Sequence, residues 1–474
     1  RHLPEMSVFF CFFRLNELFA PPPYWAGLLH EKLTSHGYCE DSLRPLQGTF
    51  TDPQQSLVAM LHTCARSKEP FAVLARLWLM SQKIERDELE PLLGKQLIEF
   101  LCDWGLLVEH DGGFGGSVDI HPCVGGYFLT DRAIGLQREL QSVYHLGGDS
   151  YALAWLAPRL PFKKALDLAT GSGVHAVLAA RHCEEVQAVD ISQRAIDFAT
   201  FNAIFNGQID KINFILGDIY DALPDGQYDL ILSNLPWVPT PDEPMELYRS
   251  GGLDGEVLIR RMVKGLDGKL ETGGWMASYI EYPKYADDTY LERVQRWLGD
   301  GSWGVVLMNL KHFTNAGYIM PHVASHSQQD LSKEFESWMT SYEEARIEGM
   351  GWAMLYVKKL VEGPSWSVEV ESDFPLTPQP WVGSWLEELA EAQSTVPPDD
   401  WAPQIHAEAE LWQGPSGWRV EWPERCLQAI DLSLAEGRLL QSLRESKAFS
   451  SEQRAALQGL RKQGLLEDPK NRTP

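Results

Sequence analysis

The segment Ala165–Gly173 combines a carboxylate with two glycines in a way that could bind a positively charged ligand. Its apolar start is typical of a buried parallel strand, and a helix is expected after it. Gly171 and Gly173 would let the turn approach a ligand closely, because a side chain there would collide with it. The carboxylate of Asp167 repels phosphate and attracts an ammonium or sulfonium group. With Ala169 between these residues, the full dinucleotide fingerprint is absent, and a cationic amino-acid nucleoside is favoured.

Two further carboxylates stand where the next two strands of the same sheet would end. Asp190 and Asp218 each follow an apolar run. The side chain of Asp190 can accept hydrogen bonds from both hydroxyls of a ribose, and Asp218 can accept one from an adenine amino group. We assign the residues that follow them, Ile191 and Ile219, to the same site. Since ligands of open α/β sheets bind at the carboxyl ends of strands, the acidic positions support one another.

The segment Asn234–Trp237 could present a nitrogen nucleophile to that ligand. It reads Asn-Leu-Pro-Trp and directly follows a fourth apolar run. The side-chain oxygen of Asn234 and the main-chain carbonyl of Leu235 can accept the hydrogens of an N–H group and aim its lone pair, while Pro236 stiffens the turn. Trp237 offers a flat face for stacking against a planar amide or base. The arrangement indicates group transfer to nitrogen, with positioning as the main source of catalysis.

Taken together, these segments resemble the class I S-adenosylmethionine-dependent methyltransferases. Within that class they look like the HemK/PrmC branch, which methylates the amide nitrogen of a glutamine in release factors. A Gly-Gly-Leu-Asp-Gly run at 251–255 supports the resemblance, because that branch carries Gly-Gly-x-Asp-Gly shortly after its Asn-Pro-Pro-Tyr motif. Upstream, Gly148 and Ser150 lie in a segment similar to the loop that often closes over the cofactor in related enzymes. The resemblance implies S-adenosyl-L-methionine as the cofactor, bound by the residues named above.

Departures from the family pattern leave the methyl acceptor open. Ala169 replaces the first glycine of Asp-x-Gly-x-Gly-x-Gly, and Leu235 and Trp237 replace the first proline and the tyrosine of Asn-Pro-Pro-Tyr. The first interpretation is an N-methyltransferase that acts on an amide or amino nitrogen of a protein, a peptide or a small molecule. Asn-Leu-Pro-Tyr variants resemble adenine dimethylases of ribosomal RNA, so an RNA adenine N6-methyltransferase is the alternative. A third interpretation is a non-enzymatic S-adenosylmethionine sensor, which would not need the Asn-x-Pro-Trp segment.

The charge of the chain disfavours nucleic acid as the substrate. The 474 residues include 66 acidic and 41 basic side chains, which gives a formal net charge of −25. A protein that binds nucleic acid would have to overcome that field with a concentrated basic patch, and the sequence has no such Lys/Arg cluster. We therefore expect a protein, peptide or small-molecule acceptor.

Cysteine usage and hydropathy indicate a cytoplasmic protein. The seven cysteines are odd in number and form no Cys-x-x-Cys pair, which is typical of reduced thiols and signals neither a disulfide framework nor a zinc site. The apolar run at 7–13 is too short to span a membrane. We expect no metal site and no membrane association.

The elements that must position the site are the strands of a doubly wound, Rossmann-like α/β sheet over residues 143–360. Seven strands are expected, at 166–168, 186–189, 212–217, 228–233, 274–281, 303–310 and 352–358. A helix predicted at 331–347 lies in an insertion between the last two strands. That insertion either roofs the site or is a plain surface helix.

The sequence before residue 143 is mainly helical by pattern. Helical segments at 71–80, 85–93 and 94–104 precede a strand and turn at 106–113, an order typical of a winged helix. Because the third helix is apolar and poor in Arg, we interpret this region as a module that contacts a protein or covers the substrate. It forms the first predicted domain, 1–142.

The sequence after residue 360 changes in composition. Prolines and carboxylates there predict an acidic, Trp-bearing linker or a loosely built cover. Beyond it, residues 439–468 repeat the order helix, helix, Gly-Leu-Leu of the N-terminal region, which suggests a second small winged-helix-like module. The second and third predicted domains are therefore 143–360 and 361–474.

Overall fold

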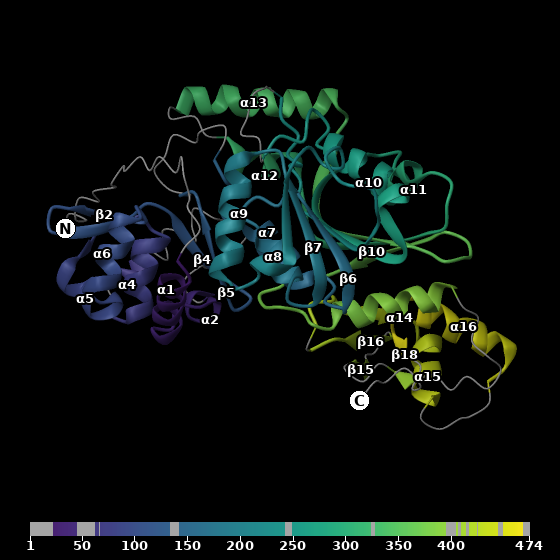
Figure 1. Ribbon diagram of the computed structural model, residues 1–474. Helices are drawn as coiled ribbons and strands as arrows, with labels where there is room; N and C mark the ends of the chain where they lie inside the picture. The colour runs from purple at the N-terminus through teal and green to yellow at the C-terminus, as the bar shows by residue number, and fades with distance from the viewer. Residues whose placement is uncertain are drawn as a thin grey trace.

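The structure is a computed structural model that describes residues 22–44, 62–65, 67–132, 142–241, 249–323, 328–394, 404–405, 409–413, 417–423, 425–443 and 449–467. Within these ranges, no helix combines the length and the apolar character needed to cross a bilayer. The apolar run at 7–13 lies outside the described residues. Figure 1 shows a central sheet with a mainly helical N-terminal part on one side and a smaller C-terminal part on the other.

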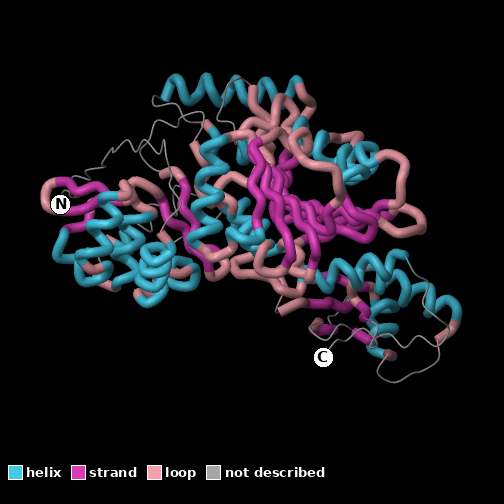
Figure 2. Tube along the Cα trace, in the orientation of Figure 1, coloured by secondary structure: helices cyan, strands magenta, loops and turns pink. Residues whose placement is uncertain are grey.

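The central sheet has eight strands in the order β13-β11-β12-β10-β9-β6-β7-β8. All neighbouring pairs are parallel except the two that β12 makes with β10 and β11. The strands are β6 Phe162–Leu168, β7 Cys183–Asp190, β8 Ile212–Leu216, β9 Tyr228–Ser233, β10 Leu270–Lys284, β11 Trp303–Phe313, β12 Gly349–Lys359 and β13 Trp366–Glu371. Figure 2 shows them side by side, and the Rossmann-like sheet expected from the sequence is present.

The predicted number of seven strands is wrong, because β13 adds an eighth at the edge beside β11. It falls in the segment predicted as a linker or loose cover. Its side chains alternate between half-buried and exposed, which is the period of an edge strand with one face on the core. Its six residues lie between Pro364 and Pro375, in sequence whose composition is typical of a loop.

Helices cover both faces of the sheet, as a doubly wound fold requires. One face carries α7 Gly148–Leu156, α8 Val174–Ala179 and α9 Gln193–Phe205, and the other carries α10 Val257–Lys269 and α11 Tyr290–Leu298 (Figure 1). The short η2 Ile209–Lys211 precedes β8. Two apolar cores result, one between the sheet and α7 and α8, the other between the sheet and α10 and α11.

An insertion between β11 and β12 contains α12 Asn315–Ile319, η3 Met320–His322 and α13 Gln328–Glu344. The helix predicted at 331–347 is confirmed as α13. Tyr318, Trp338 and Tyr342 of this insertion form a separate apolar cluster with Val238, which follows the Asn-Leu-Pro-Trp segment. The insertion therefore packs beside the predicted acceptor loop.

The N-terminal part contains α1 Pro23–Ser35, α2 Glu40–Leu43, α4 Pro70–Trp78, β1 Ile84–Glu85, α5 Arg86–Leu93, α6 Lys95–Asp103, β2 Leu107–His110, β3 Gly113–Gly116, β4 Asp119–Cys123 and β5 Gly126–Thr130. The three predicted helices are present as α4, α5 and α6, and β1, β3 and β2 form a small sheet in that order. Asn202 of α9 and Asn206, which directly follows that helix, exchange hydrogen bonds with the main chain of β5. These contacts join the N-terminal part to the central sheet.

The C-terminal part begins with α14 Val382–Ser394, which packs on the sheet through Trp385 and Leu386. This part of the segment predicted as a linker or a loosely built cover is a helix packed against the sheet. The remaining elements are β14 Gln404–Ile405, β15 Glu410–Gln413, β16 Trp418–Glu421, β17 Ile430–Leu432, α15 Leu434–Ser442, α16 Ser451–Lys462 and β18 Leu466–Glu467. Strands β15, β16 and β17 pair in a small sheet that shares an apolar core with α15 and α16.

Candidate active site

The predicted site residues gather at the carboxyl edge of four neighbouring parallel strands. Strand register places Leu168 of β6 beside Val189 of β7 and Ser233 of β9. The residues that follow these strand ends, including Asp190 and Asn234, therefore lie along one edge of the sheet. This is the edge at which open α/β sheets bind ligands.

Asp167 is buried near the end of β6, just before the strand-to-helix turn, and one of its carboxylate oxygens has no hydrogen-bond donor among the described residues. Its Oδ2 accepts hydrogen bonds from Thr170 Oγ1 at 2.6 Å and from the main-chain N–H of Ala176 at 3.0 Å. Among the described residues, nothing donates a hydrogen bond to its buried Oδ1. Burial raises the pKa of Asp167 to about 7, against the opposing effect of the two hydrogen bonds. A cationic ligand would supply the missing donor and favour the ionised form.

The two glycines of the turn after β6 have different surroundings. Gly171, at φ 52°, faces open space, so a ligand can approach its main chain. Gly173, at φ 80°, has its Cα so close to α9 that a Cβ would lie 2.8 Å from Cα of Ala199. The sequence predicts both glycines for the ligand, whereas Gly173 is required by helix packing. Ala169 adopts a left-handed φ of 54°, which explains why glycine suits this position in the family pattern.

Asp190, the last residue of β7, is hydrogen-bonded to the glycine-rich turn that follows β6. Its Oδ2 accepts from the N–H of Gly171 and its Oδ1 from the N–H of Ser192, each at 2.9 Å. Burial raises the pKa of this carboxyl group, opposed by those main-chain hydrogen bonds. Each carboxylate oxygen can accept more than one hydrogen bond, so both can still receive ribose hydroxyls.

Exposed apolar side chains flank Asp190. Ile191 is 61% exposed, and Leu216, which pairs with Asp190 across β7 and β8, is 51% exposed. Apolar side chains at a ligand edge can cover the face of an aromatic base. Sequence reasoning found Ile191 and missed Leu216. Ile219, in contrast, is buried in the core with α10, so its side chain does not reach this surface.

Asp218 forms an ion pair that the sequence did not reveal. Its Oδ2 accepts from Nη1 of Arg261 on α10 at 2.6 Å, and Arg261 also pairs with Asp221 at 2.8 Å. The second oxygen of Asp218 is the one that could accept from an adenine amino group.

The side-chain amide of Asn234 is held from both sides. Its Nδ2 donates to Asp149 Oδ2 at 2.7 Å, and Nε1 of Trp237 donates to its Oδ1 at 3.4 Å. Asp149 stands between the predicted residues Gly148 and Ser150 at the start of α7, yet sequence reasoning missed it. A carboxylate inside a segment similar to a cofactor-closing loop was the available signal.

The rest of the predicted acceptor loop divides between core and surface. The side chain of Leu235 is buried in the core with α10. Pro236 is half-buried in the turn itself. The ring of Trp237 is half-buried, 6.0 Å from that of Tyr279 on β10.

The glycines at 251–255 are explained by the path of the acceptor loop. The main chain of Val238 donates to Arg249 and accepts from Gly251, so the two segments run side by side. A Cβ on Gly255 would lie 2.5 Å from the carbonyl oxygen of Trp237. The Gly-Gly-Leu-Asp-Gly run therefore allows a close packing that fixes the loop after Asn234.

A buried carboxylate joins the insertion to the sheet. Glu281 on β10 accepts hydrogen bonds from the hydroxyls of Tyr279 and Tyr318, and Tyr318 belongs to α12. Burial raises the pKa of Glu281 well above its usual range. On the other side, the hydroxyl of Tyr342 donates to the main chain of Pro239 at 3.2 Å. The insertion is thus hydrogen-bonded both to β10 and to the segment that follows Trp237.

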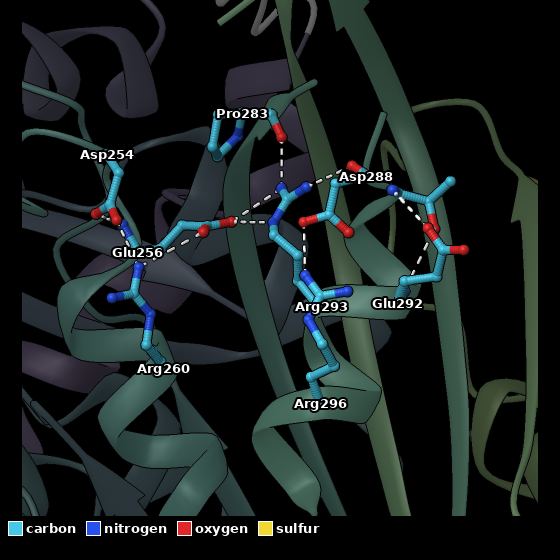
Figure 3. A network of polar contacts seen from close by, with 9 residues as sticks. Asp254, Glu256, Arg260, Pro283, Asp288, Glu292, Arg293 and Arg296 are labelled. Atoms are coloured by element: carbon cyan, nitrogen blue, oxygen red, sulfur yellow. Dashed lines mark hydrogen bonds and ion pairs between the residues drawn. The ribbon is translucent and has the colours of Figure 1, made fainter. Parts of the chain in front are cut away.

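A buried ion pair anchors the end of the glycine-containing loop (Figure 3). Arg293 on α11 donates from Nε to Glu256 Oε1 at 2.9 Å, and its other nitrogens donate to the carbonyls of Asp288 and Pro283 at 2.7 and 2.6 Å. Both charged side chains are buried. Burial raises the pKa of Glu256 to about 7 in spite of Arg293. The pair ties the loop, the end of β10 and α11 together.

Replacing Arg293 with Met is expected to destabilise the protein by about 3–5 kcal/mol, because it leaves the buried carboxylate of Glu256 with only the 3.7 Å ion pair to Arg260. Denaturant unfolding followed by circular dichroism measures this change. Arg296→Met is the control on the same helix, since its ion pair with Asp288 is exposed, and it should cost less than about 1 kcal/mol. Equal losses in the two variants would show that Glu256 does not need its partner.

Comparison with known proteins places these residues in a family context. Residues 148–249 match the family described as methyltransferase small domain. The ribosomal protein uL3 glutamine methyltransferase of Bradyrhizobium diazoefficiens is 32% identical over 166 residues, which are 32% of this chain and 52% of that protein. The release factor glutamine methyltransferase of Bordetella pertussis is 37% identical over 139 residues, or 26% and 50% of the two chains.

These similarities cover part of each protein. The chain spans about half the length of the curated relatives it matches. Among solved structures, a ribosomal protein L11 methylase from Lactobacillus delbrueckii subsp. bulgaricus has 17% identity and a TM-score of 0.27 over 45% of this chain and 81% of that one, a likeness too low to bear on function. In its central part the chain matches the methyltransferase small domain and is similar to the ribosomal protein uL3 and release factor glutamine methyltransferases.

Proposed function

We propose that the protein transfers a methyl group from S-adenosylmethionine to the side-chain amide nitrogen of a glutamine in another protein. The observation that carries this proposal is the placement of Asn234. Its amide is held by Asp149 and Trp237 at the same sheet edge as Asp190 and the turn after β6. The names of the relatives, glutamine methyltransferases of ribosomal protein uL3 and of release factors, support the same class of acceptor.

The residues present fit S-adenosylmethionine. The unpartnered Oδ1 of Asp167 would accept from its ammonium group, and the open turn at Gly171 leaves space for it. The carboxylate of Asp190 would accept from the ribose hydroxyls. Ile191 and Leu216 would cover the adenine. When bound, this cofactor supplies an electrophilic methyl group on a sulfonium.

The chain's own contribution to the reaction is orientation. Asn234 Oδ1 and the carbonyl of Leu235 accept the two N–H hydrogens of the glutamine amide, which directs the nitrogen lone pair toward the methyl group. Trp237 stacks on the planar amide and limits its rotation. Fixing the attacking nitrogen in this way removes most of the entropic barrier of a two-substrate reaction. The nitrogen releases its proton after the transfer.

The winged-helix interpretation of the N-terminal part belongs to this proposal as a module that contacts the acceptor protein. The order α4-β1-α5-α6-β2-β3, with β3 between β1 and β2, supports it.

Methylation with isotope-labelled S-adenosylmethionine tests the proposed function. Purified unmethylated ribosomal protein uL3, a release factor and ribosomal RNA are incubated separately with the chain. We expect label in one of the two proteins, on a glutamine identified by mass spectrometry, and far less label in the same time with Asn234→Ala. Label in the RNA, or in none of the three, would overturn the proposal.

A further inference from the structure

Asp149 makes the shortest side-chain contact that Asn234 has in the described structure. The distance from Asn234 Nδ2 to Asp149 Oδ2 is 2.7 Å, although the two residues are 85 positions apart in the chain. Asp149 is 7% exposed. The hydroxyl of Tyr144 donates to its other oxygen at 3.2 Å. The carboxylate is therefore held in place by the loop and helix that precede β6.

Only one orientation of the Asn234 amide suits its two neighbours. A carboxylate can only accept hydrogen bonds, and an indole N–H can only donate one. With Nδ2 toward Asp149 and Oδ1 toward Trp237, both neighbours are satisfied. A flipped amide would place two oxygens in contact on one side and two N–H donors on the other.

The carboxyl group of Asp149 is buried and also accepts several hydrogen bonds. Burial raises the pKa of its carboxyl group, while the hydrogen bonds from Asn234, Ser150 and Tyr144 oppose that rise by stabilising the ionised form. A hydrogen bond from Asn234 to an ionised group is stronger than one to a neutral group.

We propose that Asp149 is a positioning residue for methyl transfer: it accepts the Nδ2 hydrogen of Asn234 and thereby keeps Oδ1 turned toward the acceptor nitrogen. This inference rests on the proposed function, because it assigns Asn234 Oδ1 to the acceptor amide. Asp149 itself does not touch the acceptor in this assignment. Its effect is on kcat through the orientation of its neighbour.

Exchanging the two side chains tests the proposal. Asp149→Asn removes the obligate acceptor and allows the Asn234 amide to flip, and kcat should fall about 10- to 100-fold. Asn234→Asp brings two carboxylates together and should lower kcat at least as much. In the double variant, the amide introduced at position 149 can donate to the carboxylate introduced at 234, whose other oxygen still accepts from the substrate. The double variant should recover to within about tenfold of the wild type.

The readouts separate this inference from the proposed function. Kinetics use whichever of uL3 or release factor the wild type methylates, and calorimetry with S-adenosylhomocysteine verifies that each variant still binds cofactor. Wild-type inactivity would defeat the proposed function. Wild-type activity with an unchanged Asp149→Asn variant, or with a double variant no better than the worse single one, would defeat the positioning role.

A milder variant covers the case in which Asp149→Asn does not fold. Tyr144→Phe removes the longer hydrogen bond to Asp149 and leaves the Asn234 contact intact. It should lower kcat only a few-fold and leave the KM for the acceptor unchanged. An unchanged kcat in a folded Tyr144→Phe protein would contradict the role of a fixed carboxylate.

Discussion

Replacement of Asn234 with Ala is expected to lower kcat by about 10²- to 10³-fold while S-adenosylhomocysteine still binds. The loss follows from removing the oxygen that accepts from the acceptor amide, so the nitrogen lone pair is no longer aimed. The carboxylates proposed to bind the cofactor, Asp167 and Asp190, lie on other strands and keep their own hydrogen bonds. Steady-state kinetics with the unmethylated acceptor protein measure the loss of kcat, and calorimetry with S-adenosylhomocysteine measures cofactor binding.

The matched control is Asn213→Ala. Asn213 is an exposed asparagine on β8 of the same sheet, and its loss should leave kcat within about twofold, as for most surface substitutions. A kcat for Asn234→Ala as high as that of this control would remove Asn234 from the reaction.

Cofactor affinity is expected to fall about tenfold for each pH unit below about 7, which is the raised pKa of Asp167. In the free protein this carboxyl group is protonated below that pH. A ligand with an ammonium group binds the ionised form, so below about 7 binding must first remove a proton. Above about 7 the group is already ionised and affinity levels off. Calorimetric titrations with S-adenosylhomocysteine between pH 5.5 and 8.5, about 1.5 units on either side of that pKa, measure the slope.

Asp167→Asn is the control for this pH dependence. The amide keeps the shape of the side chain but cannot ionise, so affinity should be weak at high pH and nearly constant across the range. A wild-type affinity that does not change with pH, or an equal slope in the variant, would show that Asp167 does not face the cofactor's charge.

Much of the fold and site could be predicted because local pattern and chemistry agree there. Strand β7 ends in Asp190, Asn234 directly follows β9, and Asp218 stands two residues after the end of β8. Parallel strands bring their carboxyl ends to one edge regardless of the details of packing. For that reason the places of Asp190 and Asn234 at this edge could be predicted from spacing.

The parts that could not be predicted depend on contacts between distant segments. Nothing near Gly173 indicates that α9 approaches it, and nothing near Asn234 indicates Asp149 as its partner. The edge strand β13 and the helix α14 are short amphipathic elements within Pro-rich sequence, and their pairing with the sheet decides their structure. Tertiary contacts override local composition in such segments.

The most direct test of the site at the sheet edge is calorimetric titration of S-adenosylhomocysteine into the folded wild-type chain, at a pH above the pKa of Asp167. We predict saturable heat for a single site, with affinity reduced at least about tenfold by Asp190→Ala, which removes the acceptor for both ribose hydroxyls. A well-folded chain that gives no binding heat would contradict the assignment of this edge to a cationic methyl donor.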